Sequence, residues 1–364
     1  MKRCLIVFSL ILSLMVCFVG SGLTDGVEYE SDYETGIKMA SNDLTNVKQL
    51  QTAVDLLQQL GSYKLSKSYV QYFQSIVDLL QKAPDFSRIR MRLELCGQAA
   101  SFAADLESRG LPSCELLITY VDTRILESNA NYKKAKEAYA GMAVLDSAER
   151  AWNLGLLLSI KKGDVVTFGH YEQDGYQNNG KEPIEWIVLS VDYKGHAVLI
   201  SKYIIDAHEF SSATTTCDWG NSSIRTWLNS NFANSAFNKT EQTMVLLTTS
   251  IDYKKNNSKT GTTTDQIYLM SVDETYAYLG ETNNDKMCRM TNYAMKKYNS
   301  FRYINGTAYG EWWLRSYWKG DDGMVWVNYI LPDGGGMGVS PNIQLGIRPM
   351  CQVDLYQLML LSEE

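Results

Sequence analysis

The sequence predicts an α+β protein, with an N-terminal helical-hairpin repeat or bundle followed by a mixed α+β domain. Apolar residues recur at helical spacing between about residues 33 and 158, as in Leu50, Ala53, Val54 and Leu57. From Gly163 onward, short runs rich in β-branched and aromatic residues replace that spacing. A run of helices followed by a run of short strands is typical of an α+β protein with two different parts. An alternating order of strand and helix, typical of a parallel α/β fold, is absent.

Residues 1–22 have the order of a secretory signal peptide. Lys2 and Arg3 precede an uncharged run over 5–19, and small residues follow, so we expect cleavage after Gly22. The run is short for a membrane span, which needs about 20 residues. An uncleaved anchor is the alternative, and Val16 disfavours a lipoprotein signal at Cys17. We therefore expect a secreted or envelope-associated protein without a membrane span after cleavage, with domains over 23–158 and 159–364.

Composition excludes several classes of protein. Hydrophobic residues make up 45% and charged residues 21%, which is typical of a globular chain and not of a disordered one. The formal net charge of -7 disfavours nucleic-acid binding through phosphate contacts. We therefore expect no nucleic-acid partner.

The cysteines do not encode a dense disulfide framework. Outside the predicted signal peptide the number is odd and the spacing is wide, and no C-x-x-C pair occurs. We expect most of these thiols to be free and buried, and the pairing of any one disulfide stays open. The residues are Cys96, Cys114, Cys217, Cys288 and Cys351.

The helical region divides at turn-forming segments, at 61–62, 83–85, 110–112 and 129–131. Helices separated by such short breaks form antiparallel hairpins. The segments 60–66 and 141–147 are weakly similar in sequence, as two copies of an internal repeat would be. The pair resembles degenerate tetratricopeptide-type hairpins. A plain helical bundle is the alternative.

The second half mixes short strands and short helices. Expected strands lie over 165–168, 186–191, 195–201, 266–269, 324–330 and 346–355. Ser222 and Ser271 are placed to cap helices that begin just after them. The glycines at 334–336 lie between two β-rich runs, which favours a hairpin turn over a phosphate-binding loop.

A series of motifs in order resembles the family named domain of unknown function 6273, over about residues 160–354. The motifs lie at 168–173, 183–189, 219–229, 264–271, 312–316 and 346–349. We assign structural roles to motif residues Trp186, Trp219, Arg225, Trp227, Asp265, Trp313, Arg315 and Arg348.

The same pattern is distantly similar to the C-type-lectin-like fold of formylglycine-generating enzymes. That chemistry needs two cysteines close together in the sequence, whereas Cys288 and Cys351 are 63 residues apart.

The stretch Trp312, Trp313 and Arg315 has two interpretations. It could form an aromatic platform for a sugar or peptide, or it could pack in the core with alternate tryptophans inward and outward. We favour the packing role. We also expect Arg225 and Arg348 to bind buried carboxylates or carbonyls, for example those of Asp265 or Glu185, because a buried guanidinium needs such a partner.

Residues 316–323 are expected to form an exposed loop. Tyr317 and Trp318 are aromatic, and Asp321 and Asp322 follow them. Exposed loop aromatics often mark a binding surface, so these four residues, with Trp312, are the candidate ligand-binding residues. The two aspartates could ligate calcium, but calcium needs six or more oxygen ligands and the others are not visible in the sequence.

The sequence favours an exported, non-catalytic protein that recognises a glycan or a peptide of the cell envelope. No H-x-x-x-H or H-E-x-x-H pair and no G-x-S-x-G elbow is present, and we expect no resident metal or cofactor. The alternatives are an enzyme, of formylglycine-generating or cryptic hydrolytic type, and a purely structural envelope protein.

Overall fold

The protein is α+β, as predicted, in a computed structural model that describes residues 24–81, 83–176, 178–254 and 258–361. The predicted signal peptide, residues 1–22, lies outside the described residues. The chain divides into two compact units, Met1–Ala151 and Trp152–Glu364. In the described part of the chain, no helix combines the length and the apolar character that crossing a membrane requires.

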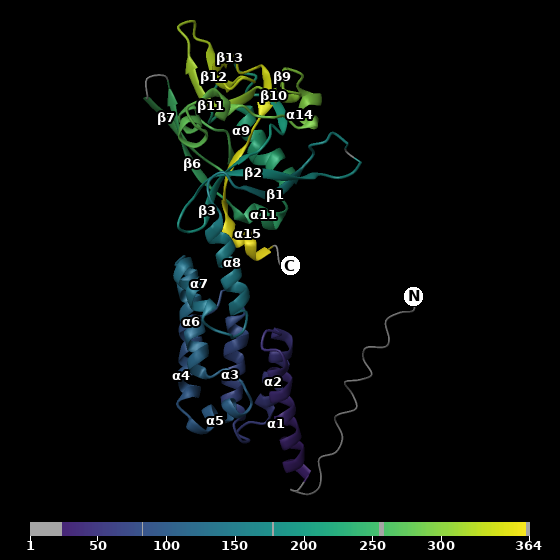
Figure 1. The fold of residues 1–364 in the computed structure, drawn as a ribbon, viewed down its shortest axis with the longest axis vertical. Coiled ribbons are helices and arrows are strands. Elements are labelled where there is room, and N and C mark those ends of the chain that lie inside the picture. Colours follow the sequence, from purple (N-terminus) through teal and green to yellow (C-terminus); the bar gives the residue numbers. More distant parts are fainter. Residues whose placement is uncertain (1–23, 82, 177, 255–257, 362–364) are drawn as a thin grey trace. The chain divides into compact units, whose positions relative to one another are not determined.

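The N-terminal unit is built from helices that run alongside one another (Figure 1). Helix α2 buries Leu50, Ala53, Val54 and Leu57, the residues that predicted it. Helix α8, Ser147–Ser159, begins in this unit and ends in the next. The other helices are α1 Thr24–Asn42, α2 Val47–Gln59, α3 Ser66–Leu79, α4 Phe86–Gly97, α5 Ala100–Ser108, α6 Cys114–Ser128 and α7 Tyr132–Ala140.

The two loops of the predicted internal repeat, in segments 60–66 and 141–147, share a backbone conformation. Lys64 in the first loop and Leu145 in the second both have positive φ, at 44° and 49°. Each lies two residues before a buried serine, Ser66 or Ser147, that opens the next helix. Non-glycine residues adopt the left-handed conformation at a cost in steric energy. Its occurrence at equivalent positions of the two loops is therefore a structural similarity that accompanies the sequence similarity.

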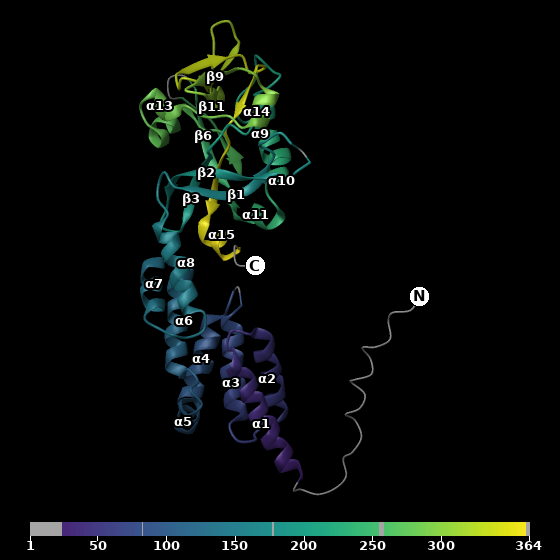
Figure 2. The ribbon, with the colours of Figure 1, turned by 45° about the vertical axis from the view of Figure 1, so that its right-hand side comes forward.

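The first sheet of the C-terminal unit has the strand order β1-β2-β3-β15-β5, and β8 also pairs with β15. The paired strands are antiparallel, and Figure 2 shows β1, β2 and β3 side by side. Trp186 on β2 is fully buried and donates its indole N–H to the carbonyl of Phe168 at 2.7 Å. The strands are β1 Val165–Tyr171, β2 Glu182–Val191, β3 His196–Ser201, β5 Val245–Leu246, β8 Ile267–Tyr268 and β15 Met350–Asp354.

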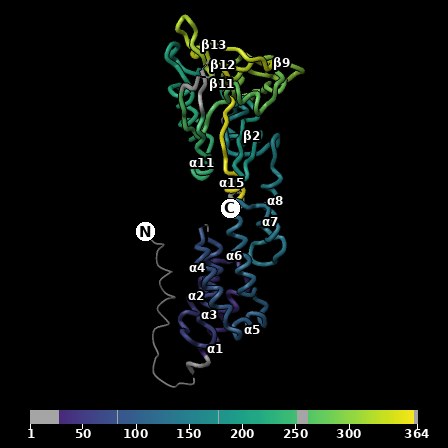
Figure 3. The backbone as a smooth tube through the Cα atoms, turned by 90° about the vertical axis from the view of Figure 1, so that its left-hand side faces the viewer, coloured from purple at the N-terminus to yellow at the C-terminus, as the bar shows by residue number. Residues whose placement is uncertain are grey.

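The second sheet has the order β13-β12-β11-β14-β4. Strand β11 pairs parallel with β14 and antiparallel with β12, and Figure 3 shows β11, β12 and β13 gathered together. The turn between β12 and β13 contains Gly334 at φ 84°, so the predicted hairpin turn is confirmed. The strands are β4 Asp206–Glu209, β11 Trp312–Lys319, β12 Val325–Ile330, β13 Gly336–Val339 and β14 Gln344–Ile347.

Two small hairpins and several short helices complete this unit. The predicted caps are confirmed: Ser222 accepts the N–H of Arg225, and Ser271 accepts that of Glu274. The hairpins are β6 Thr248–Lys254 with β7 Ser258–Asp265, and β9 Phe301–Ile304 with β10 Thr307–Gly310. The helical segments are α9 Ser223–Trp227, η1 Leu228–Phe232, α10 Ala233–Ala236, α11 Lys239–Met244, α12 Val272–Glu274, η2 Thr275–Leu279, α13 Asn283–Lys286, α14 Asn292–Lys297 and α15 Leu355–Leu361.

Candidate functional site

The predicted exposed loop over 316–323 is wrong for its first half. Strand β11 continues to Lys319, because Tyr317 pairs with Val327 and Trp318 with Trp326 on β12. The Tyr317 side chain points inward and is 8% exposed. Only the tip, residues 320–323, is a turn, so Tyr317 is not available as a surface contact.

The expected alternation of Trp312 and Trp313 is also wrong, because both side chains are fully buried. Each indole N–H donates to a backbone carbonyl, from Trp312 to Lys286 at 3.1 Å and from Trp313 to His208 at 2.9 Å. Strand β11 lies in the middle of its sheet, between β12 and β14. Trp312 therefore belongs to the core and is not a ligand platform.

At the tip of the β11–β12 hairpin, part of the predicted exposure is confirmed. Trp318 is half-buried and stacks on Trp326 at 6.4 Å between ring centroids. Its ring also covers Gly338, where an added Cβ would come within 1.8 Å of the indole. Asp321 and Asp322 are exposed, and Asp322 accepts the N–H of Met324 within the turn.

A group of three carboxylates lies elsewhere, on and next to β1 and β2. Glu172, Asp174 and Glu182 bring one oxygen each within 4.8 Å of the others. These oxygens accept backbone N–H groups, for example from Gly175 to Glu172 and from Gln173 to Glu182, both at 2.6 Å. Turn stabilisation therefore accounts for the cluster.

Arg315 and Arg348 are buried, at 4% exposure each. Arg315 donates to the carbonyl of Leu269 at 2.7 Å and to Glu274 at 2.9 Å. Arg348 donates from Nε to the carbonyl of Ser201 at 3.0 Å, so the expectation of a carbonyl partner is confirmed and Glu185 is not its partner. Both arginines hold strands together, which fits their predicted structural role.

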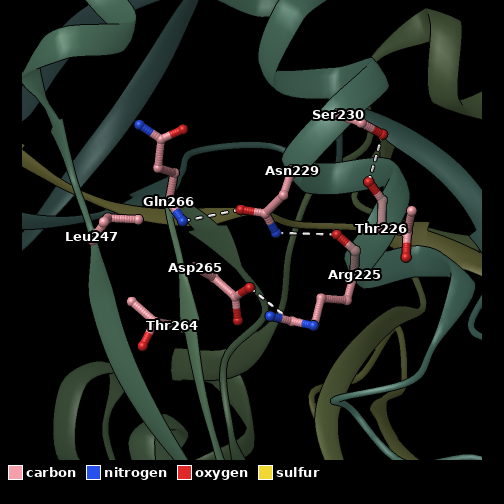
Figure 4. Close-up of a pocket in the computed structure, with 8 residues that line it drawn as sticks. All are labelled: Arg225, Thr226, Asn229, Ser230, Leu247, Thr264, Asp265 and Gln266. Atoms are coloured by element: carbon pink, nitrogen blue, oxygen red, sulfur yellow. Dashed lines mark hydrogen bonds and ion pairs between the residues drawn. The ribbon is translucent and has the colours of Figure 1, made fainter.

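A pocket of about 410 Å³ lies beside the motif at 219–229 (Figure 4). One wall is the α9–η1 helical segment, and the other is formed where β6 begins and β7 ends. The volume is within the range of small-ligand sites. The lining residues are Arg225, Thr226, Asn229, Ser230, Leu247, Thr264, Asp265 and Gln266.

Asn229 fastens the two walls of the pocket to each other. Its amide N–H₂ donates to the carbonyls of Arg225 at 3.0 Å and Ile267 at 2.8 Å. Its amide oxygen accepts the backbone N–H groups of Gln266 at 3.0 Å and Ile267 at 3.1 Å. All four hydrogen-bonding positions of this side chain are used, so Asn229 is a fixed part of the wall.

Arg225 and Asp265 form the charged centre of the pocket. Arg225 Nε donates to Asp265 Oδ1 at 2.7 Å, as expected from the sequence, and Nη1 donates to the carbonyl of Gly220 at 2.9 Å. The other carboxylate oxygen accepts the indole N–H of Trp219 at 3.2 Å. Asp265 is 3% exposed and accepts a hydrogen bond at each carboxylate oxygen, whereas Arg225 Nη2 has no hydrogen-bond partner among the residues that the structure describes.

A second polar centre surrounds Asp206, which is fully buried on β4. Its carboxylate accepts the hydroxyl of Tyr171 at 2.5 Å and the Nζ of Lys297 at 2.8 Å, and His208 Nε2 lies 3.8 Å away. In the sequence, the only sign of this centre is an aspartate and a histidine at alternate positions of a short run. The partners come from β1 and α14, which are distant in the sequence.

The pKa shifts of Asp206 and Lys297 favour the charged form of both groups. Burial acts to raise the pKa of Asp206, but the neighbouring His208 and the hydrogen bonds from Lys297 and Tyr171 outweigh it and lower the pKa. Burial acts to lower the pKa of Lys297, but its hydrogen bond to Asp206 raises that pKa above its ordinary value. Burial, together with the charge of Asp206, raises the pKa of Tyr171. The arrangement therefore holds an ion pair.

The five cysteines of the described residues are free and buried. Burial raises the pKa of the Cys217 thiol to about 11 and of the Cys114 thiol to about 12. Burial also raises the thiol pKa of Cys288 and Cys351. Thiols with raised pKa values remain protonated at neutral pH and are poor nucleophiles.

Residues 194–355 match the model of a family described as domain of unknown function (DUF6273). The C-terminal unit therefore contains this domain. The match begins at the β2–β3 turn, so strands β1 and β2, with the motifs at 168–173 and 183–189, precede it. No curated protein and no solved structure matches the chain.

Proposed function

Given a C-terminal unit that contains this domain, we propose that the protein is exported and binds a glycan or a peptide of the cell envelope without turning it over. The binding site is the pocket beside Arg225. One observation carries the proposal: the pocket's polar side chains are held by internal hydrogen bonds, while Arg225, which lines the pocket, has donors at Nη2 without a partner among the described residues. A preformed concave surface with a few open polar groups is typical of a ligand site.

The protonation of the buried groups supports binding over catalysis. A general base needs a pKa near neutrality and an open proton acceptor. Asp206 is instead occupied by Lys297 and Tyr171, and the described thiols have raised pKa values. Cys288 and Cys351 are both buried, which disfavours the formylglycine-generating alternative.

The hairpin tip is a second contact surface in this proposal. Trp318 and Trp326 offer stacked indoles, and Asp321 and Asp322 offer exposed carboxylates beside them. An indole and a carboxylate next to each other suit a sugar ring, which stacks on one and hydrogen-bonds the other. The predicted lectin-like fold would also place ligand contacts on loops between late strands.

A glycan and peptide array with three proteins tests the site. The wild-type chain should bind a subset of probes, and Arg225→Lys should reduce that signal at least tenfold, because lysine lacks the planar fork of donors. The double variant Asp321→Asn/Asp322→Asn should reduce the signal by less than Arg225→Lys does, because the hairpin tip is the secondary contact. Melting curves for all three proteins control for folding.

The two variants distinguish binding in the Arg225 pocket from binding at the hairpin tip. If the tip variant loses the signal and Arg225→Lys keeps it, the ligand binds at the hairpin and the pocket assignment is wrong. Release of a product from any bound probe would contradict the non-catalytic proposal.

Export has its own test. N-terminal sequencing of the protein recovered from the envelope or culture medium should begin within a few residues of Leu23. An intact Met1 would contradict cleavage, and recovery from the cytoplasm alone would contradict export.

A further inference from the structure

We infer that the Arg225 pocket selects an uncharged sugar rather than an acidic sugar or a peptide. This inference rests on the proposed function, in which the pocket binds an envelope glycan or peptide, and it names the ligand class. Three observations support it: the net charge of the side chains that line the pocket, the presence of both donors and acceptors without partners, and the backbone groups of the strand wall that already form hydrogen bonds.

The lining carries no surplus charge. Arg225 is the cation and Asp265, 2.7 Å away, is the anion, and the other lining side chains are neutral. An entering carboxylate or phosphate would approach Asp265 without a second cation to compensate it, and the chain as a whole has a net charge of -7. Binding an anion here would therefore cost more than binding a neutral polar group.

The open hydrogen-bonding groups include donors and acceptors. Arg225 Nη2 offers donors. Ser230 donates its hydroxyl hydrogen to the carbonyl of Thr226 at 2.6 Å, so its oxygen lone pairs remain for a ligand. Gln266 spends its amide N–H₂ on the carbonyls of Gln242 and Val245, both at 3.2 Å, which leaves its amide oxygen open. A sugar hydroxyl donates and accepts at the same atom, so a polyol matches this mixed set.

The strand wall disfavours an extended peptide. A peptide that adds to a strand needs open backbone N–H and C=O groups along the edge. At the pocket, the N–H groups of Gln266 and Ile267 are both taken by Asn229 Oδ1, and the carbonyl of Ile267 accepts the Asn229 amide. These N–H groups and this carbonyl are therefore not available for a ladder with a second chain at Gln266 and Ile267.

Leu247 supplies an apolar contact. Its side chain is 70% exposed at the edge of the pocket (Figure 4), which is unusual for leucine. A pyranose ring has one face of C–H groups that packs on such a side chain while its hydroxyls face the polar wall. The pocket therefore presents an apolar edge and a polar wall, as an uncharged sugar requires.

The experiment titrates the full mature chain with three sets of probes, by ligand-observed NMR and calorimetry. The probes are neutral methyl glycosides (of glucose, galactose, mannose and N-acetylglucosamine), glucuronic acid, and a capped tripeptide. Leu247→Ala changes the pocket edge without loss of buried surface, and Tyr303→Ala on β9 is the matched control, because its side chain is 65% exposed and does not line the pocket.

We expect at least one neutral glycoside to bind, with affinity about threefold to tenfold weaker in Leu247→Ala, at least tenfold weaker in Arg225→Lys and unchanged in Tyr303→Ala. If glucuronic acid or the tripeptide binds with this dependence and the neutral sugars do not, the ligand class is wrong while the proposed function stands. If the neutral sugars bind equally well to all variants, both the ligand class and the pocket assignment are overturned.

Discussion

At the scale of single residues, the half-buried Arg225 and the buried Arg315 and Arg348 show how a guanidinium group is paired. Arg225 has a carboxylate partner, Asp265, that is close to it in space but 40 residues away. Arg315 binds Glu274 and a backbone carbonyl, and Arg348 binds the carbonyl of Ser201 and lies over the Trp312 ring at 5.1 Å. A carbonyl or an aromatic face thus replaces an anion where no acid is near.

Trp313→Ala should lower the free energy of unfolding by about 3–5 kcal/mol, because the side chain is fully buried and the change leaves a cavity. The carbonyl of His208 would also lose its indole donor. Urea unfolding of the variant and the wild type measures the difference. Tyr303→Ala, at an exposed site, should change the value by less than about 0.5 kcal/mol. Equal melting of Trp313→Ala and wild type would contradict the burial.

Asp206→Asn should reduce stability in a pH-dependent way. The folded pKa of Asp206 is lowered, so its ionised form adds stability above the unfolded pKa of about 3.9, and that stability is lost as pH falls. At pH 7 the variant should be less stable by about 1.5–3 kcal/mol, the usual value for hydrogen bonds to a charged group. Unfolding measured from pH 7 to pH 3 should show the difference shrinking; a constant difference would contradict the lowered pKa.

At the scale of elements, helix ends show where local sequence and local geometry disagree. Helix α6 ends at Ser128, and Ala130 follows it at φ 57°. The N–H groups of Ala130 and Asn131 donate to the carbonyls of Glu127 and Leu126, both at 2.9 Å. This pair of bonds is the Schellman ending, which usually has glycine at the position of Ala130. Alanine there keeps the turn but carries the steric cost of the left-handed conformation.

Ala130→Gly should therefore stabilise the protein, by about 1 kcal/mol, because glycine relieves that cost. Ala138→Gly, inside helix α7, is the matched control and should destabilise it by about 0.5–1 kcal/mol. Thermal unfolding of both variants measures the two effects. The same sign for both would show that the backbone conformation at Ala130 is not the cause.

At the scale of the whole molecule, the chain is two compact units joined within one helix. The division falls between Ala151 and Trp152, inside α8, and each unit has its own buried core. The predicted boundary at 158/159 lies near the end of the same helix. The helical spacing continues through α8, so the change of pattern after Ser159 marks the end of the helix.

A fragment that begins at Trp152 should fold by itself, because it keeps the part of α8 that clusters with the C-terminal unit. Circular dichroism should show mixed helix and strand, and urea should unfold the fragment in one cooperative transition. The full-length chain is the reference. A fragment that aggregates or stays unfolded would show that the two units share a core.

Local patterns in the sequence determined the α+β class, the order of helices before strands, the caps at Ser222 and Ser271, and the hairpin turn at Gly334. Each depends on residues within a few positions of one another, through helical spacing, a capping oxygen or a glycine in a turn. The Arg225–Asp265 pair was also predicted, because a buried guanidinium requires a partner.

Only the tertiary structure decided which aromatic residues are buried and where a pocket forms. Trp312, Trp313 and Tyr317 are buried because β11 lies between β12 and β14, and nothing within β11 encodes that central position. The Arg225 pocket exists because Asn229 joins a helix to a strand some 38 residues away. Burial and concavity are set by segments that are distant in the sequence, whereas spacing and capping are set by neighbours.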